Sequence, residues 1–382
     1  MSRQLAAAPH AAHVAFASAA QGPAPHHRAE PPRWGAAPPG AALSPRAEGP
    51  FHWDPLQATR VALFPILHDD LWEQHKKVQR NHWVVENVDL SHDRFDWERR
   101  MKPAERAFIK VFLAWFSRGD AEVLDLVDEI APHVEHVDEA RLYLNEQRAQ
   151  EGVHIEAYNK QIEALGLPAA EVAAIQRAFL DDPHVRALAD WAQQWKAPGV
   201  PIGELLVADA FVEGGFFQSA FAVLRWLRER NLLPGITEYN EYIIRDEGDH
   251  TESIGRLVAR LAPAARPSTA RIHEIARSGA AVAAAFATHS LPALDAPGDA
   301  GLGLVGMNRA LLAQSIEHQF DAVCGVLGEP PLFGAPNPFP FMEKAALIEV
   351  HKGNFFEVRT HAYSGLKSGA LAFCVRGDPV RR

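Results

Sequence analysis

The sequence has only two cysteines, Cys324 and Cys374, among its 382 residues. This scarcity excludes a disulfide framework and a zinc site built from several thiolates, and it fits the reducing cytoplasm. The sequence also lacks any run of about 18 uncharged apolar residues, so we expect no membrane-spanning segment. A basic surplus is missing too, because the formal net charge is −10. Since nonspecific nucleic-acid binding needs a basic surface, we expect no nucleic-acid partner.

Residues 1–50 lack the varied composition of a folded domain. Half of them are Ala or Pro, and such a stretch buries too little apolar surface to offset the entropy of ordering. We therefore expect a disordered tail over residues 1–50. Arg outnumbers the acidic residues there, so a targeting peptide is the alternative, but a continuous apolar segment is missing and prolines interrupt any long amphipathic helix.

The rest of the chain repeats apolar residues at steps of three and four, the period of an α-helix. Strand-like alternation is scarce, so we predict an all-α domain over residues 51–352, followed by a flexible partner-binding tail over residues 353–382. The predicted helices cover residues 101–130, 137–166, 202–231, 236–262, 268–290, 303–326 and 339–352.

Two of these helices carry the pattern Glu-x-x-His, at Glu151–His154 and at Glu247–His250. Residues three apart share one helical face, so each Glu points in the same direction as its His. A single pair of this kind could be a solvated charged turn. Both pairs, however, have apolar residues one turn away, which indicates buried faces.

Two other long helices each place an acid, Asp120 or Glu213, on an apolar face. Taken singly, Asp120 could lie at a bundle end and Glu213 could pair with an Arg. A carboxylate buried without a partner is costly, so the four acids together require a counter-charge. One carboxylate from each of two helices and Glu-x-x-His from two others form the ligand set of a dinuclear metal site in a four-helix bundle. Oxygen donors with one imidazole per ion favour iron or manganese.

Around these residues the sequence resembles the small, radical-generating subunit of class I ribonucleotide reductase, a member of the ferritin-like superfamily. The resemblance runs from about Phe64 to Tyr363 through six ordered segments: HWVVENVDLSHD, FLAWFSRGDAEV, EGVHIEAY, FVEGGFFQSAF, PGITEYNEYIIRDEGDH and NFFEVRTHAYS. It implies a ferritin-like helical bundle. It also implies that one metal ion is held by Asp120, Glu151 and His154 and the other by Glu213, Glu247 and His250.

The same resemblance assigns redox roles to residues near the metals. Tyr158, one turn after His154, would carry a stable tyrosyl radical in a dry pocket lined by Phe217, Phe221 and Ile243. Asp246 would accept hydrogen bonds from His154 and from the indole of Trp83, which forms a path for an electron between the surface and Tyr158. Taken without the resemblance, Trp83, Phe217 and Phe221 could be core residues, and Tyr158 a hydrogen-bonded core tyrosine.

Tyr363 would be the transfer tyrosine of a mobile tail that docks on the large subunit. It stands 19 residues before the C-terminus, and the chain ends in the basic sequence CVRGDPVRR, whereas tails of the family are acidic. The manner of docking therefore departs from the family pattern, and the apolar stretch GALAF is a candidate anchor.

The resemblance implies the small subunit of a ribonucleoside-diphosphate reductase, an oxidoreductase that depends on thioredoxin or glutaredoxin. It implies a homodimer that works with a large catalytic subunit, two metal ions per chain with iron preferred over manganese or a mixed pair, and a cytoplasmic location. The alternatives are a ligand-binding oxidase on the same scaffold, a desaturase or hydroxylase, and a storage or structural bundle. The oxidase, desaturase and hydroxylase have no reason to keep Trp83, Asp246 and Tyr363 together. Storage proteins are usually shorter and do not need a radical-bearing tyrosine.

Overall fold

The structure, a computed structural model, describes residues 49–291 and 306–342. All described residues belong to one unit, Glu48–Arg382. The predicted tails, Tyr363 and most of the predicted helix 339–352 lie outside the described residues.

The described residues are mostly helical, and the β-pairing among them is an isolated antiparallel bridge between Phe51 and Leu261. The α-helices are α1 (Asp69–Arg80), α2 (Asp93–Phe95), α3 (Pro103–Val134), α4 (Asp138–Ala164), α5 (Ala169–Asp181), α6 (Pro183–Gln193), α7 (Ile202–Phe211), α8 (Gln218–Glu229), α9 (Pro234–Ala259), α10 (Thr269–Ser290) and α11 (Arg309–Val326). Short 3₁₀-helices are η1 (Pro55–Thr59), η2 (Val85–Asn87) and η4 (Gln194–Lys196), and π-helical turns are η3 (Asp96–Arg100) and η5 (Val212–Phe217).

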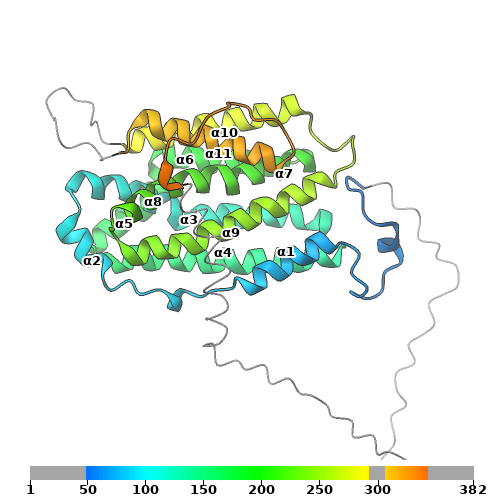
Figure 1. Ribbon diagram of the computed structural model, residues 1–382, viewed down its shortest axis with the longest axis horizontal. Helices are drawn as coiled ribbons and strands as arrows, with labels where there is room; N and C mark the ends of the chain where they lie inside the picture. Colours follow the sequence, from blue (N-terminus) through cyan, green and yellow to red (C-terminus); the bar gives the residue numbers. More distant parts are fainter. Residues whose placement is uncertain (1–48, 292–305, 343–382) are drawn as a thin grey trace, which may run out of the picture. The chain divides into compact units, whose positions relative to one another are not determined.

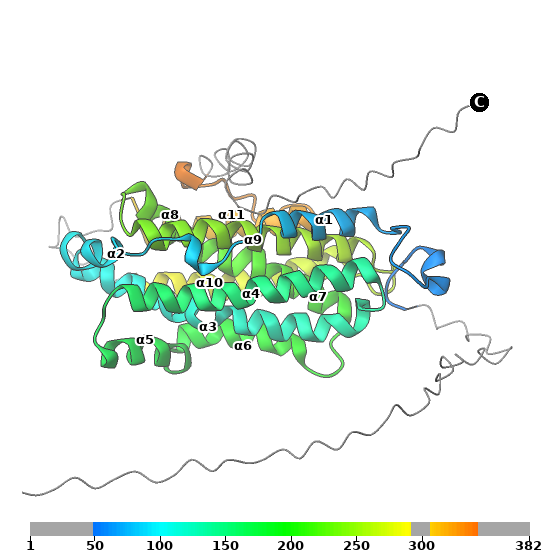
Figure 2. The same ribbon diagram turned by 90° about the horizontal axis from the view of Figure 1, so that it is seen from below.

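Four long helical runs form the bundle: α3, α4, α9 and the continuous run α7–η5–α8. Helix α4 packs against α3 and α9, while α9 also packs against α7 and α8. Helix α1 lies along α4 and α9, and α10 and α11 pair with each other and cover α7 and η5, as Figures 1 and 2 show. The prediction of an all-α, ferritin-like bundle is confirmed.

The run Ile202–Glu229 is long and apolar enough to cross a membrane by length and composition. However, 94% of its most apolar window is buried inside the structure. This is the behaviour of a central core helix, since a helix that is apolar on all sides needs protein around it in water.

The start of α9 is fixed by two aspartates of the α2–η3 segment, which lies more than 130 residues earlier in the sequence. The carboxylate of Asp93 accepts from the backbone N–H groups of Gly235 and Ile236, at 3.1 Å each, and Asp96 accepts from Leu233 at 2.9 Å. The first N–H groups of a helix have no partner within it, so these bonds satisfy groups that would otherwise be buried alone. They also fix the position of the helix that carries Glu247 and His250.

The predicted helix 202–231 is not a uniform α-helix. It widens into the π-helical turn η5, in which Glu213 lies. Gly214 and Gly215 explain the close packing there, because a Cβ at Gly214 would lie 2.6 Å from Val323 of α11 and one at Gly215 would lie 2.9 Å from the ring of Phe320. The contact with α11 thus requires two residues without side chains.

The predicted helix 303–326 was also too long at its start. Helix α11 begins at Arg309, and the side chain of Asn308 accepts from the backbone N–H of Leu311 at 2.9 Å. An Asn that caps a helix in this way marks its first turn. Helices α1, α2, α5 and α6 lie outside the predicted helical segments.

Candidate metal centre

Six acidic and imidazole side chains from four helical elements meet in the core of the bundle. Each of them has no exposed surface. They form two groups whose possible ligand atoms lie within 4.8 Å of one another: Asp120, Glu151, His154 and Glu247 in the first, and Glu151, Glu213, Glu247 and His250 in the second. The six residues that the sequence singled out are therefore brought together.

Glu151 and Glu247 belong to both groups, and each divides its two oxygens between the two histidines. Glu151 places Oε2 3.4 Å from Nδ1 of His154 and Oε1 3.0 Å from Nδ1 of His250. Glu247 places Oε1 3.2 Å from Nδ1 of His154 and Oε2 2.9 Å from Nδ1 of His250. Asp120 and Glu213 each belong to one group only. These residues could hold a pair of cations, with two carboxylates common to both donor groups and one further carboxylate in each.

Many oxygens of the cluster accept no hydrogen bond from the residues that the structure describes. The buried atoms that form no hydrogen bond are both oxygens of Asp120, both of Glu151, one oxygen each of Glu213 and Glu247, and Nδ1 of His154. Buried polar groups are normally satisfied, and an unpaired buried charge is costly. Four carboxylates would balance the charge of two divalent cations. The donor set therefore fits a pair of oxygen-preferring metal ions.

The electrostatics of the cluster indicate a shortage of positive charge. Burial, followed by the charges of Glu151 and Glu247, raises the pKa of Asp120 well above its usual range. Burial and Glu247 likewise raise the pKa of Glu213. Burial opposes charging of the imidazoles, yet the carboxylates beside them raise the pKa of both His154 and His250.

The outer nitrogen of each histidine is held by a hydrogen bond. Nε2 of His154 lies 3.2 Å from Oδ2 of Asp246, and Nε2 of His250 lies 3.1 Å from Oε1 of Gln150. Each contact orients its ring so that Nδ1 faces the acids. Such a contact fixes the tautomer of a metal-ligating histidine and raises its basicity.

Asp246 connects this cluster to the buried indole of Trp83. The Oδ2 atom of Asp246 accepts a hydrogen bond from the indole Nε1 of Trp83 at 2.7 Å. The same oxygen lies 3.2 Å from Nε2 of His154. The Oδ1 atom of Asp246 accepts from Nε and Nη2 of Arg245, at 3.2 and 3.1 Å. Burial would raise the pKa of Asp246, but His154 and Arg245 outweigh it and lower the pKa, so this carboxylate is ionised.

Tyr158 is fully buried, and its hydroxyl has no hydrogen-bond partner in the structure. Its ring stacks on Phe116, with centroids 5.0 Å apart, and Phe116 stacks in turn on Phe221 at 5.2 Å. Phe217 lies 6.4 Å from Phe116, and Ile243 is buried one turn before Glu247 on α9. Burial, then Asp120 and Glu247, raises the pKa of Tyr158 well above its usual range, so the phenol is protonated.

Sequence reasoning missed several residues that complete this site. Phe116 is the ring stacked directly on Tyr158, and Gln147 donates to Oε1 of Glu213 at 2.9 Å. Gln150 contacts His250. The helical spacing could have revealed the glutamine at 147, since it precedes Glu151 by four residues and shares its face.

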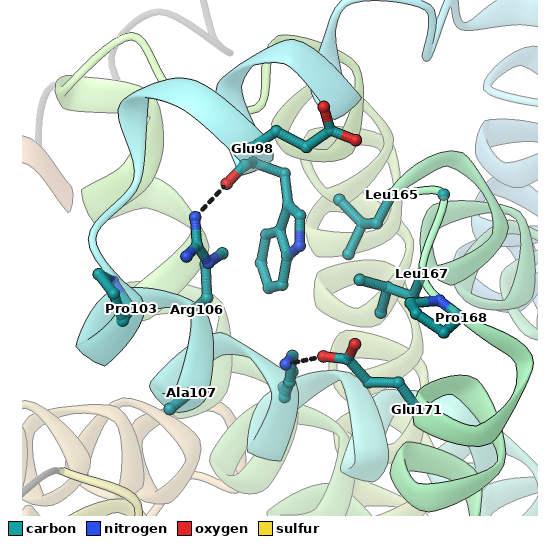
Figure 3. A pocket seen from close by; sticks show the side chains of 11 residues that line it. Glu98, Pro103, Arg106, Ala107, Leu165, Leu167, Pro168 and Glu171 are labelled. Atoms are coloured by element: carbon teal, nitrogen blue, oxygen red, sulfur yellow. Dashed lines mark hydrogen bonds and ion pairs between the residues drawn. The ribbon is translucent and has the colours of Figure 1, made fainter.

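A surface pocket of about 470 Å³ lies at the start of α3 and the α4–α5 connection. Figure 3 shows Pro103, Arg106 and Ala107 on one side and Leu165, Leu167 and Pro168 on the other. None of the six clustered residues lines this pocket. The pocket therefore gives no access to the acids and histidines.

Comparison with known proteins gives a consistent result. Residues 60–338 match the family model of the ribonucleotide reductase small chain. A ribonucleoside-diphosphate reductase small chain from Neurospora crassa is 35% identical over 321 residues, which cover 84% of this chain and 74% of that one. The human ribonucleoside-diphosphate reductase subunit M2 is 37% identical over 306 residues, which cover 80% of this chain and 75% of that one.

Solved structures show the same fold. The ribonucleotide reductase Rnr4 homodimer from Saccharomyces cerevisiae aligns with a TM-score of 0.66 at 24% identity, covering 80% of this chain and 90% of that one. The dimanganese(II) protein NrdF from Streptococcus sanguinis aligns with a TM-score of 0.64 at 17% identity. The alignment covers 75% of this chain and 98% of that one.

Proposed function

The chain belongs to the ribonucleotide reductase small-chain family and is the small subunit of a ribonucleoside-diphosphate reductase, and from this premise we propose that its buried cluster holds two metal ions that generate a radical on Tyr158. Asp120 and His154 would bind one ion and Glu213 and His250 the other, with Glu151 and Glu247 shared. The observation that carries this proposal is the pair of overlapping donor groups with unpartnered oxygens. The family match gives no support to the alternative of a ligand-binding oxidase.

We propose iron as the metal pair. When bound, the ions would supply the oxygen-dependent oxidation that removes one electron from Tyr158. Two manganese ions or a mixed pair fit the same oxygen and imidazole donors, so metal analysis of the purified protein decides between them.

The residues around Tyr158 would protect its radical. The ring of Phe116 stacks directly on the phenol, and Phe221 stacks on Phe116. Both phenylalanines are fully buried, so they place apolar surface beside Tyr158. Phe217 and Ile243 complete the proposed pocket. A phenoxyl radical persists only where water and reductants cannot reach it, so dryness is what these side chains contribute.

Asp246 and Trp83 would form the route by which an electron reaches Tyr158. Asp246 holds both the indole N–H of Trp83 and the outer nitrogen of His154, and the two rings stack with centroids 6.0 Å apart. The carboxylate can accept and return the indole proton as the electron moves. Tyr363, outside the described residues, would continue the route to the large subunit.

Family membership and the acidic composition also support a proposal about partners and location. The chain would act in the cytoplasm as a homodimer with the large catalytic subunit, without a nucleic-acid or membrane partner. Reduction of ribonucleotides would take place on the large subunit, which receives the radical.

Electron paramagnetic resonance tests the proposal directly. The metal-free chain is mixed with ferrous iron and oxygen, and we expect two ions per chain and a tyrosyl signal. Tyr158→Phe removes only a hydroxyl, so it should keep both metals and the fold while losing the signal and nucleotide reduction. Normal reduction by Tyr158→Phe together with the large subunit would show that the oxidant is not this tyrosine.

A further inference from the structure

Trp83 contacts two tyrosines of α9 in different ways. Tyr242 stacks on the indole with ring centroids 5.3 Å apart and an interplanar angle of 26°. Tyr239 lies 5.9 Å away and is tilted by 47°. Tyr239 is buried and donates its hydroxyl to the carbonyl of Val85, whereas Tyr242 is partly exposed. Of the two phenols, therefore, Tyr242 is the one that both stacks on Trp83 and reaches the surface.

We propose that Tyr242 is a redox station through which Trp83 exchanges an electron with the protein surface. The proposal rests on the proposed function, because the oxidant is the Trp83 radical formed on the route to Tyr158. Trp83 itself is only 5% exposed, so a donor outside the protein has little direct access to it. Electron tunnelling falls steeply with distance, so a stacked, partly exposed ring is a favourable intermediate.

The step is a balanced one-electron, one-proton exchange. The oxidised Trp83 takes one electron from the phenol of Tyr242, which releases its proton to water and becomes a neutral tyrosyl radical. A donor at the surface then returns one electron, and a proton from water restores the phenol.

The charges around Tyr242 favour loss of the proton together with the electron. The guanidinium of Arg245 lies 5.7 Å from the ring centroid and is fixed by its bonds to Asp246. A positively charged tyrosine radical would be repelled by this guanidinium. Glu238, one turn earlier on α9 and exposed, is a nearby carboxylate that attracts the leaving proton.

Tyr239 would not serve in the same way. Its hydroxyl proton is directed at a backbone carbonyl, which is far too weak a base to accept it. The two tyrosines therefore provide a matched pair, because both rings contact Trp83 and one alone has an outlet for the proton. Tyr242→Phe and Tyr239→Phe keep the ring and its packing while each loses one hydroxyl.

The experiment measures electron entry into the isolated, metal-loaded subunit without nucleotide or large subunit. The Tyr158 radical is formed, ferrocyanide is added as a reductant too polar to enter the core, and the radical signal is followed by stopped-flow absorbance and paramagnetic resonance. We expect Tyr242→Phe and Trp83→Phe each to slow the decay at least about tenfold, equivalent to about 1.4 kcal/mol in barrier height. Tyr239→Phe should decay at the parent rate.

A second arm replaces Tyr242 with 3-aminotyrosine, which is more easily oxidised and traps the radical. We expect an aminotyrosyl signal to grow as the Tyr158 signal falls, and to be lost when Trp83→Phe is added. If Tyr242→Phe decays at the parent rate and no aminotyrosyl signal forms, Tyr242 is not a station. In that outcome the Tyr158 radical still forms and the proposed function stands, whereas a parent chain that forms no Tyr158 radical would overturn both.

Discussion

Because Glu247 belongs to both donor groups, its loss should weaken both metal ions. Glu247→Gln keeps the size of the side chain but removes one negative charge from a fully buried cluster. With both ions bound, one positive charge would then lack a partner. An unpaired buried charge costs about 3–5 kcal/mol, which corresponds to roughly a hundred- to several-thousand-fold loss of affinity.

Glu213→Gln is the matched control, because it removes the same charge from a residue that belongs to one group only. It leaves the group of Asp120, Glu151, His154 and Glu247 complete, so that group should keep its ion. In Glu247→Gln neither group is complete, and we expect no tightly held ion.

The assay is elemental analysis after gel filtration, followed by calorimetric titration of each metal-free variant with manganese(II). Thermal unfolding of the metal-free proteins checks that both variants are folded. One ion retained at the parent affinity in Glu247→Gln would refute the sharing of this carboxylate. Loss of both ions from Glu213→Gln would refute the separation into two donor groups.

Three further predictions concern residues around the cluster. Asp246→Asn removes the carboxylate that orients His154, so metal affinity measured by titration should fall about 10–100-fold; an unchanged affinity would exclude this orienting role. Asp93→Ala leaves two buried N–H groups of α9 without an acceptor and should lower the free energy of unfolding by about 1–3 kcal/mol in a urea titration, with the metal content of the folded protein unchanged. Tyr363→Phe should leave the yield of the Tyr158 radical and binding to the large subunit unchanged while abolishing nucleotide reduction, and normal turnover would remove it from the route.

The sequence predicts best those side-chain positions that local helical geometry alone determines. Glu151 and His154 share a face because they are three residues apart, and this holds however the helices pack. The same reasoning identified Glu247 and His250, and the apolar neighbours of Asp120 identified a buried acid. All of these side chains meet in the cluster.

Features that depend on contacts between distant segments could not be predicted in this way. The widening at Glu213 accompanies the close approach of α11 to Gly214 and Gly215, more than 100 residues away in sequence. The stacking of Phe116 on Tyr158 depends on the packing of α3 against α4. Likewise, the contact of Trp83 with Tyr242 depends on how the segment after α1 lies on α9.

The complete burial of the cluster has a kinetic consequence. A pair of metal ions held by these six side chains, none of which has exposed surface, could enter or leave only when the bundle opens locally. Exchange of the ions would therefore be limited by the rate of this opening, and equilibrium affinity would have little influence once the bundle has closed. The metal pair that the protein carries would then reflect which ions were available while the chain folded, so the conditions of expression become part of its chemistry.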